Sequence, residues 1–211
     1  MDIVAQCEGL VATIECKKTE TNVVTFLLPT QPKQFIAGTS NFVWVRRIND
    51  STQRLAVSAG EVSIPPETSE AKFAVVANDS KNSNSRLIEA DVQILLKGTI
   101  EYAGRSRSIR GLARTGPIVP ILVTNAKLYI DEFDTSKVST ESGSLAAEFH
   151  NVSPVQFIRF RKAFVTHRSV ELDEQTVFVV NADSLPKLLA ELATARPSYP
   201  HENQWVNLDA R

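Results

Sequence analysis

Histidine, cysteine and glycine are scarce in this chain, and their scarcity excludes several kinds of chemistry. Among 211 residues there are three histidines, two cysteines and eight glycines. The histidines, at 150, 167 and 201, are isolated, so nothing in their spacing suggests a histidine metal site or a catalytic triad. Two cysteines without a neighbouring histidine disfavour zinc. The sequence also contains no glycine-rich phosphate loop and no Gly-x-Ser-x-Gly elbow.

Long hydrophobic runs are missing as well. No apolar stretch reaches the roughly 20 residues that cross a bilayer, and no signal peptide opens the sequence. Lysine and arginine total 23 against 24 acidic residues, so the net charge of −1 exerts no general attraction on nucleic acid. Together with the low cysteine count, these absences predict a reduced, cytoplasmic protein without a membrane partner. A length of 211 residues suits one domain.

The first seventeen residues predict a β-hairpin. An apolar run precedes Glu8-Gly9, and a second run rich in β-branched residues follows over 10–17. Glu8 and Gly9 suit a two-residue turn, because glycine takes φ > 0 without steric cost. With that loop, Cys7 pairs with Leu10, which sets the register of the two strands.

Counting back along this register places Asp2 opposite Glu15, with Lys17 on the same face. Carboxylates that face each other across a sheet repel, and a divalent cation between them would relieve the repulsion. We therefore expect Asp2 and Glu15 to bind Mg²⁺, with Mn²⁺ as a substitute. Lys17 would assist the attacking water or the phosphate in phosphodiester hydrolysis. The alternative is an ordinary solvated strand face with a weak Glu15–Lys17 pair.

Asp2-Ile-Val-Ala, followed by Glu15-Cys16-Lys17 on the next strand, resembles the motif of the PD-(D/E)xK nucleases, the restriction-endonuclease-like superfamily. The resemblance implies a bacterial member with an α/β (α+β, mixed-sheet) fold and a restriction-endonuclease-like core. Its activity would be metal-dependent cleavage of DNA, with Asp2, Glu15 and Lys17 as the catalytic residues. Cleavage of both strands implies a homodimer or two successive nicks.

Members of that superfamily normally carry a helix, and usually a strand, before the motif aspartate. Only Met1 precedes Asp2 in this sequence, so the resemblance implies an N-terminally truncated member. A site made incomplete in this way leaves an alternative function. The chain would then be a non-catalytic nuclease-like module that binds nucleic acid or a partner protein.

The rest of the sequence predicts one nuclease-like domain over 1–195, with a β-rich insertion at 41–64, and an extended tail over 196–211. Proline at position 120 argues for the start or edge of a strand, and Gly60 for a break in another. The apolar runs predict further strands at 23–28, 73–77, 118–123, 126–130, 155–165 and 176–180, and the continuous apolar run at 73–77 is typical of a central strand.

The clearest helical pattern covers 86–103. Gly104 is expected to end this helix. In the resembled nucleases a helix after the motif strand packs on the sheet, and a glutamine on it sometimes reaches the active site. This makes Gln93 an accessory candidate, with an exposed helix-surface glutamine as the alternative. The apolar stripe of this helix is predicted at Leu87, Ala90, Ile94 and Gly98, with Leu95 and Tyr102 extending it.

Residues 105–114, RSRSIRGLAR, place four arginines in a predicted loop after this helix. Arginine forks suit phosphate oxygens, so Arg105, Arg107 and Arg110 are candidate DNA-backbone contacts. A solvated connecting loop is the alternative. Arg159 and Arg161 alternate with aromatic residues on a later strand, which predicts an aromatic core with an arginine rim. A nucleic-acid surface is the alternative.

Overall fold

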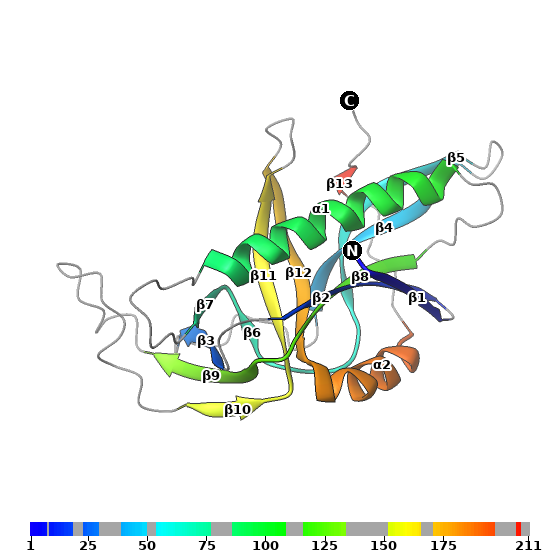
Figure 1. Ribbon diagram of the computed structural model, residues 1–211. Helices are drawn as coiled ribbons and strands as arrows, with labels where there is room; N and C mark the ends of the chain where they lie inside the picture. Colours follow the sequence, from blue (N-terminus) through cyan, green and yellow to red (C-terminus); the bar gives the residue numbers. More distant parts are fainter. Residues whose placement is uncertain are drawn as a thin grey trace.

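The computed structural model describes residues 1–7, 9–18, 23–29, 39–49, 54–76, 86–108, 116–133, 152–165, 171–196 and 206–207. Within these ranges the chain forms an α+β fold of mixed sheets, rich in strands, with two α-helices (Figure 1). The elements are β1 Ile3–Cys7, β2 Leu10–Lys17, β3 Val23–Pro29, β4 Thr39–Asn49, β5 Arg54–Ser63, β6 Glu70–Ala71, β7 Phe73–Val76, α1 Arg86–Ser108, β8 Gly116–Thr124, β9 Lys127–Phe133, β10 Ser153–Val155, β11 Phe157–Val165, β12 Glu171–Asn181, a 3₁₀ turn Ala182–Ser184, α2 Leu185–Ala193 and β13 Val206–Asn207.

The larger sheet is built around β8, all of whose residues are buried. β2 runs parallel along one edge of β8, and β1 follows as the antiparallel partner of β2. The opposite edge of β8 is shared by two strands in succession. β4 pairs with it at 116–118, and β12 pairs with it at 121–124. The sheet therefore forks at β8 into a β4–β5–β13 branch and a β12–β11–β6 branch.

The fork accounts for a proline in the middle of a central strand. Pro120 was expected at the start or edge of its strand, but it lies inside β8 and is registered with Thr13 of β2. It falls at the changeover between β4 and β12, where neither of these strands is registered with β8. A missing backbone N–H is tolerated where one edge of the strand has no regular partner.

A smaller sheet has the order β10-β9-β3-β7. β3 is parallel to β9 and antiparallel to β7. The stretch 73–77 was expected to be a central strand, but among the described strands β7 lies at the edge, and Phe73 on it is 55% exposed. A short apolar run does not distinguish a strand covered on both sides from one covered on one side only.

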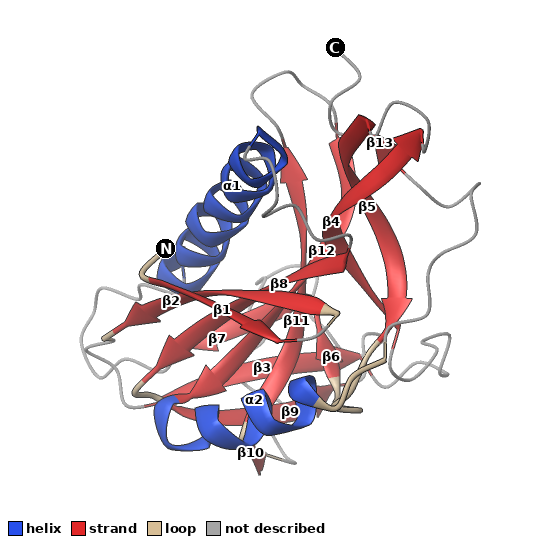
Figure 2. Ribbon diagram, turned by 90° about the vertical axis from the view of Figure 1, so that its right-hand side faces the viewer, coloured by secondary structure: helices blue, strands red, loops and turns tan. Residues whose placement is uncertain are grey.

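The two helices cover opposite faces of the β1–β2–β8 region, and Figure 2 shows them on either side of the β1–β2 hairpin. α1 and the smaller sheet pack against one face of the larger sheet, in a core that contains Leu95, Phe26 and Phe160. α2 packs against the other face, where Leu188 and Leu192 join a core that includes Ile14. Alternation along the strands sends their successive side chains into these two cores.

The face that α1 buries differs from the predicted one. Ala90 is exposed and Ile94 is 54% exposed, so the predicted stripe is wrong at both positions, although Leu95 is correctly assigned. Both sets of residues recur at helical spacing, and only the docking of α1 on the sheet selects between them. Among the helix residues 88–105, whose burial is described, the buried positions are Ile88, Val92, Leu95, Leu96, Thr99 and Ala103.

Several predicted boundaries also need correction. α1 continues through Gly104 to Ser108, so the predicted stop is wrong; glycine only weakens a helix interior. β5 passes Gly60 without a break, because ladder pairing with β4 continues on both sides of it. The β-rich stretch 41–64 is confirmed as the β4–β5 hairpin, which joins the main sheet through β8. Within the predicted tail, β13 pairs with β5.

No helix in the described part of the chain is long and apolar enough to cross a membrane.

Candidate functional site

The N-terminal hairpin forms in the predicted register. Cys7 pairs with Leu10 and Ile3 pairs with Ile14, which brings Asp2 level with Glu15 just outside the ladder. Gly9 has φ 88°, the positive value expected of the turn, while Glu8 lies outside the described residues. Gly9 also packs against the start of β8, since a Cβ on Gly116 would lie 2.7 Å from its carbonyl oxygen. This close approach seats the hairpin on the central strand.

Asp2 is tied to the backbone of the neighbouring strand. Its amide nitrogen donates to the carbonyl oxygen of Ile14 at 2.9 Å. Its Oδ2 accepts a hydrogen bond from the amide of Cys16 at 2.8 Å. The carboxyl group of Asp2 is therefore held beside the residues that flank Glu15.

Glu15 is a buried, charged group. Glu15 is 5% exposed. Its Oε1 lies 3.0 Å from Nζ of Lys17, and its Oε2 contacts the amino group of Met1. Burial raises the pKa of Glu15, but hydrogen bonds from Met1 and Lys17 outweigh this effect and leave the pKa below its ordinary value. The alternative, a solvated surface pair of Glu15 and Lys17, does not fit, because the Glu15 carboxylate is buried.

Lys17 lies beside Glu15 as expected, and it also contacts a residue that was not predicted as part of the site. Its Nζ lies 3.7 Å from Oδ1 of Asp91, which α1 supplies. The hydrogen bond to Glu15 raises the pKa of Lys17, and the nearby charge of Asp91 adds to the rise. Burial raises the pKa of Asp91, and Lys17 offsets part of that increase.

Asp91 had a detectable signal in the sequence once the helix is phased correctly. It immediately precedes Val92 and lies three residues after Ile88, at the border of the buried stripe. An acid at that border faces the sheet that the helix covers. Asp91 also lies four residues after Leu87 and three before Ile94, so it fell within the predicted stripe, and it was missed because only the apolar residues of that stripe were considered.

The register between β2 and α1 is set by a second contact. Thr13 Oγ1 lies 2.8 Å from Thr99 Oγ1, with both side chains fully buried. Thr13 and Lys17 are four residues apart on a strand, about 13 Å. Asp91 and Thr99 are eight apart on a helix, about 12 Å. The two contacts therefore match along antiparallel elements, and they place Asp91 beside Lys17.

The donor chemistry of the site suits a hard cation. Asp2 and Glu15 offer carboxylate oxygens, and Mg²⁺ commonly binds through one or two carboxylates while it keeps several waters. The lowered pKa keeps Glu15 in the ionised form that a metal ion requires. Within the described ranges, no group of three or more histidine, cysteine, aspartate or glutamate side chains is arranged to hold a metal by itself. Water and substrate phosphate would have to supply the remaining ligands.

The other predicted site residues lie along α1. Gln93 is half-buried and lies two residues after Asp91. Two residues turn an α-helix by about 200°, so the side chains of Gln93 and Asp91 leave the helix on nearly opposite sides. Arg105 is exposed and lies, with Arg107, within the helix instead of in the predicted loop. Arg110 lies outside the described residues.

Of the two arginines on β11 that were expected at a rim, Arg159 is buried and Arg161 is half-buried. Arg159 is 1% exposed and donates from Nη2 to the carbonyl oxygens of Ile64 and Pro66, at 2.7 and 2.6 Å. Arg161 Nε lies 2.8 Å from Oε1 of Glu70 on β6. Burial raises the pKa of Glu70 despite these two arginines. Arg159 therefore fastens the segment after β5 to the sheet, and is unavailable to nucleic acid.

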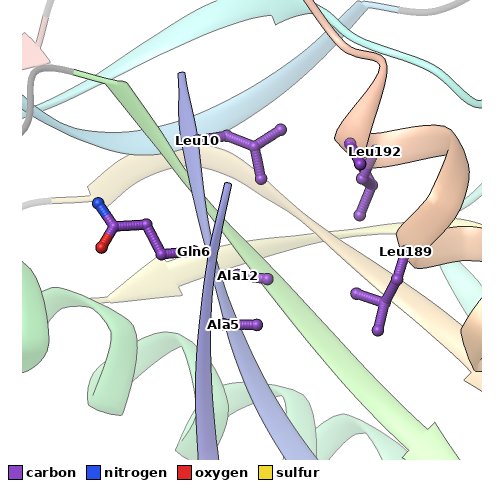
Figure 3. A pocket seen from close by; sticks show the side chains of 7 residues that line it. Ala5, Gln6, Leu10, Ala12, Leu189 and Leu192 are labelled. Atoms are coloured by element: carbon purple, nitrogen blue, oxygen red, sulfur yellow. The ribbon is translucent and has the colours of Figure 1, made fainter. Parts of the chain in front are cut away.

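Among the residues that the structure describes, the opposite side of the hairpin carries no comparable group of charged side chains. An apolar hollow of about 190 Å³ lies between the hairpin and α2, lined by Ala5, Leu10 and Ala12 on one side and by Leu189 and Leu192 on the other (Figure 3). Gln6, at the margin of the hollow, points away from it in the figure. The hairpin thus has an apolar face toward α2 and an ionised face toward α1.

Comparison with known proteins adds no relative to this description. No protein-family model matches the chain, and neither a curated protein nor a solved structure matches it.

Proposed function

We propose that this chain is a metal-dependent endonuclease that hydrolyses phosphodiester bonds in DNA, with a restriction-endonuclease-like core. The observation that carries the proposal is the grouping of Asp2, Glu15 and Lys17 on one face of the hairpin, with Glu15 buried and ionised. An ordinary surface face would leave Glu15 in solvent, where its interaction with Lys17 would be weak, whereas Glu15 is 5% exposed.

The arrangement of elements supports the same proposal. β2 carries Glu15 and Lys17, Asp2 lies just before β1 beside them, α1 packs over the face to which Glu15 and Lys17 point, and β8 runs parallel to β2. The proposal takes α1, which follows β2 in the chain after β3 to β7, as the helix that packs on the sheet after the motif strand. Arg105 and Arg107, near the end of α1, are the proposed contacts to the DNA backbone.

Each residue has a defined part in the proposed reaction. Asp2 and Glu15 would hold Mg²⁺, or Mn²⁺ in its place; when bound, the ion supplies an activated water and shields the charge of the phosphate. Lys17 remains protonated beside Glu15 and donates hydrogen bonds to the phosphate or the attacking water, which stabilises the charge that develops. In the structure the amino group of Met1 occupies one oxygen of Glu15, so a metal ion would have to displace it.

The test is nicking of supercoiled plasmid in Mg²⁺ or Mn²⁺ by the wild type, Glu15→Gln and Lys17→Met. We expect each variant to lose about 100-fold or more in rate, because each lacks a group that acts on the reacting phosphate. Glu101→Gln and Lys18→Met are matched controls, since both side chains are exposed. Calorimetric titration with Mn²⁺ should show binding that Glu15→Gln weakens.

Equal nicking by all five proteins would indicate a contaminating nuclease and would refute the assignment. Binding of DNA without cleavage by the wild type would instead support a non-catalytic nuclease-like module. Loss of rate in the two site variants but not in the two controls would establish the activity together with its site.

A further inference from the structure

Lys17 is held between carboxylates from two separate elements. Glu15, on the same strand, lies 3.0 Å from its ammonium nitrogen, and Asp91, on α1, lies 3.7 Å from it on the helix side. Asp91 is also partly buried, with its side chain 20% exposed. The lysine therefore has one partner within the proposed metal site and a second partner that belongs to the helix.

These two partners are not equivalent once Glu15 serves as a metal ligand. A cation on Glu15 draws on the same negative charge that attracts Lys17, so the hold of Glu15 on the lysine weakens. Asp91 lies on a different element and is not among the proposed ligands. Its attraction for the ammonium group persists, and it acts from the side of the site opposite the strand.

The placement of Asp91 does not depend on its own contact with Lys17. The buried Thr13–Thr99 hydrogen bond fixes α1 against β2. The buried side chains of Ile88 and Val92, before and after Asp91, fix the rotation of the helix about its axis. Asp91 is therefore presented to Lys17 by a rigid element. A carboxylate presented in this way restricts a flexible lysine side chain to fewer positions.

We propose that Asp91 is a positioning residue that holds the Lys17 ammonium group at the reacting phosphate. The proposal rests on the proposed nuclease function. It assigns to α1 a part in catalysis that the motif on the hairpin does not contain. Asp91 acts through Lys17 and has no contact of its own with the reacting atoms.

Asp91→Asn tests this role, because asparagine keeps the shape and removes the charge. Glu101→Gln is the matched control, since it removes one negative charge from an exposed position on the same helix. We expect Asp91→Asn to lower kcat about 10-fold, as loss of an orienting partner commonly does, while KM for DNA stays the same or falls. Loss of a negative charge near the DNA path does not weaken binding, so this split separates positioning from general damage.

A double-mutant comparison asks whether Asp91 works through the lysine. In the Lys17→Met background, Asp91→Asn should cause no further loss of rate. In the protein that keeps Lys17, Asp91→Glu should be more active than Asp91→Asn, since glutamate restores the negative charge. A further 10-fold loss in the Lys17→Met background, or a kcat for Asp91→Asn equal to that of Glu101→Gln, would overturn the proposal.

A readout without catalysis distinguishes failure of this inference from failure of the nuclease assignment. Acetylation by acetic anhydride, followed by mass spectrometry, compares the reactivity of Lys17 with that of exposed Lys18 in the same molecule. Asp91→Asn should raise the relative rate at Lys17 several-fold, because the amine is held less firmly. An unchanged rate would overturn the positioning role, whether or not the wild type cleaves DNA.

Discussion

The hydroxyl pair Thr13–Thr99 joins the strand that carries Glu15 and Lys17 to the helix that carries Asp91, and its geometry predicts an unequal response to mutation. The two Oγ1 atoms are 2.8 Å apart. Thr99 Oγ1 also donates to the carbonyl oxygen of Leu95 at 2.9 Å, which uses its only hydrogen. Thr13 must therefore be the donor to Thr99.

Valine replaces threonine with almost the same volume, so each substitution removes a hydroxyl and little else. Thr13→Val leaves Thr99 bonded to Leu95 and removes one neutral hydrogen bond, at a cost of about 1 kcal/mol. Thr99→Val leaves the buried Thr13 hydroxyl without its acceptor, which costs about 1–3 kcal/mol. With both hydroxyls replaced, no donor is stranded, so the double variant should cost less than the sum of the single ones, by about 1–2 kcal/mol.

Urea unfolding of the four proteins measures these differences, with comparison of midpoints at an unchanged m-value. The expected order of destabilisation has Thr99→Val above Thr13→Val, with the double variant close to Thr13→Val. Additive costs, within about 0.5 kcal/mol, would show that the two hydroxyls are not coupled. A larger cost for Thr13→Val than for Thr99→Val would refute the assigned direction of the hydrogen bond.

Two further predictions concern the helix face and the charge of the motif glutamate. Leu95→Ala should reduce the free energy of unfolding by about 2–5 kcal/mol, whereas Ile94→Ala, at the exposed neighbouring position, should change it by less than about 0.5 kcal/mol in the same urea assay; similar values would contradict the observed face of α1. The folded-state pKa of Glu15 lies below its unfolded value of 4.5, so the stability it contributes is present above that pH and is lost as the pH falls through the folded pKa. The free energy of unfolding of the wild type and of Glu15→Gln, measured between pH 2.5 and pH 6, should differ by an amount that becomes smaller as the pH falls. A difference that does not change with pH would contradict the conclusion that Glu15 is held in its charged form.

Patterns within short segments carried the correct predictions. The register of the hairpin follows from a turn around Gly9 and from period-two alternation, both confined to the first seventeen residues. Asp2, Glu15 and Lys17 meet because of that local geometry. The α+β class and most strands are readable for the same reason, since a strand or helix shows its period in its own sequence.

Predictions that depended on contacts between distant segments failed or were missing. The stripe chosen for α1 was as periodic as the buried one, and it failed at Ala90 and Ile94 because the surface that covers the helix comes from strands elsewhere in the chain. Arg159 was expected at a rim, because the alternation of residues along β11 does not show that two buried backbone carbonyl oxygens from another segment accept hydrogen bonds from its guanidinium group. Pro120 was expected at the start or edge of a strand, because the sequence of one strand does not show that its partner changes from β4 to β12 partway along it.

The amino-acid sequence by itself determined the hairpin and the three side chains that it brings together, because hydrogen bonding and alternation between adjacent strands operate over a few residues. Only the tertiary structure decided that this face would be covered, that Glu15 would be buried yet ionised, and that Asp91 would reach Lys17. Those outcomes depend on the docking of α1, a helix that begins about seventy residues later in the chain. Its position results from many weak packing contacts acting together, and no single segment encodes that sum.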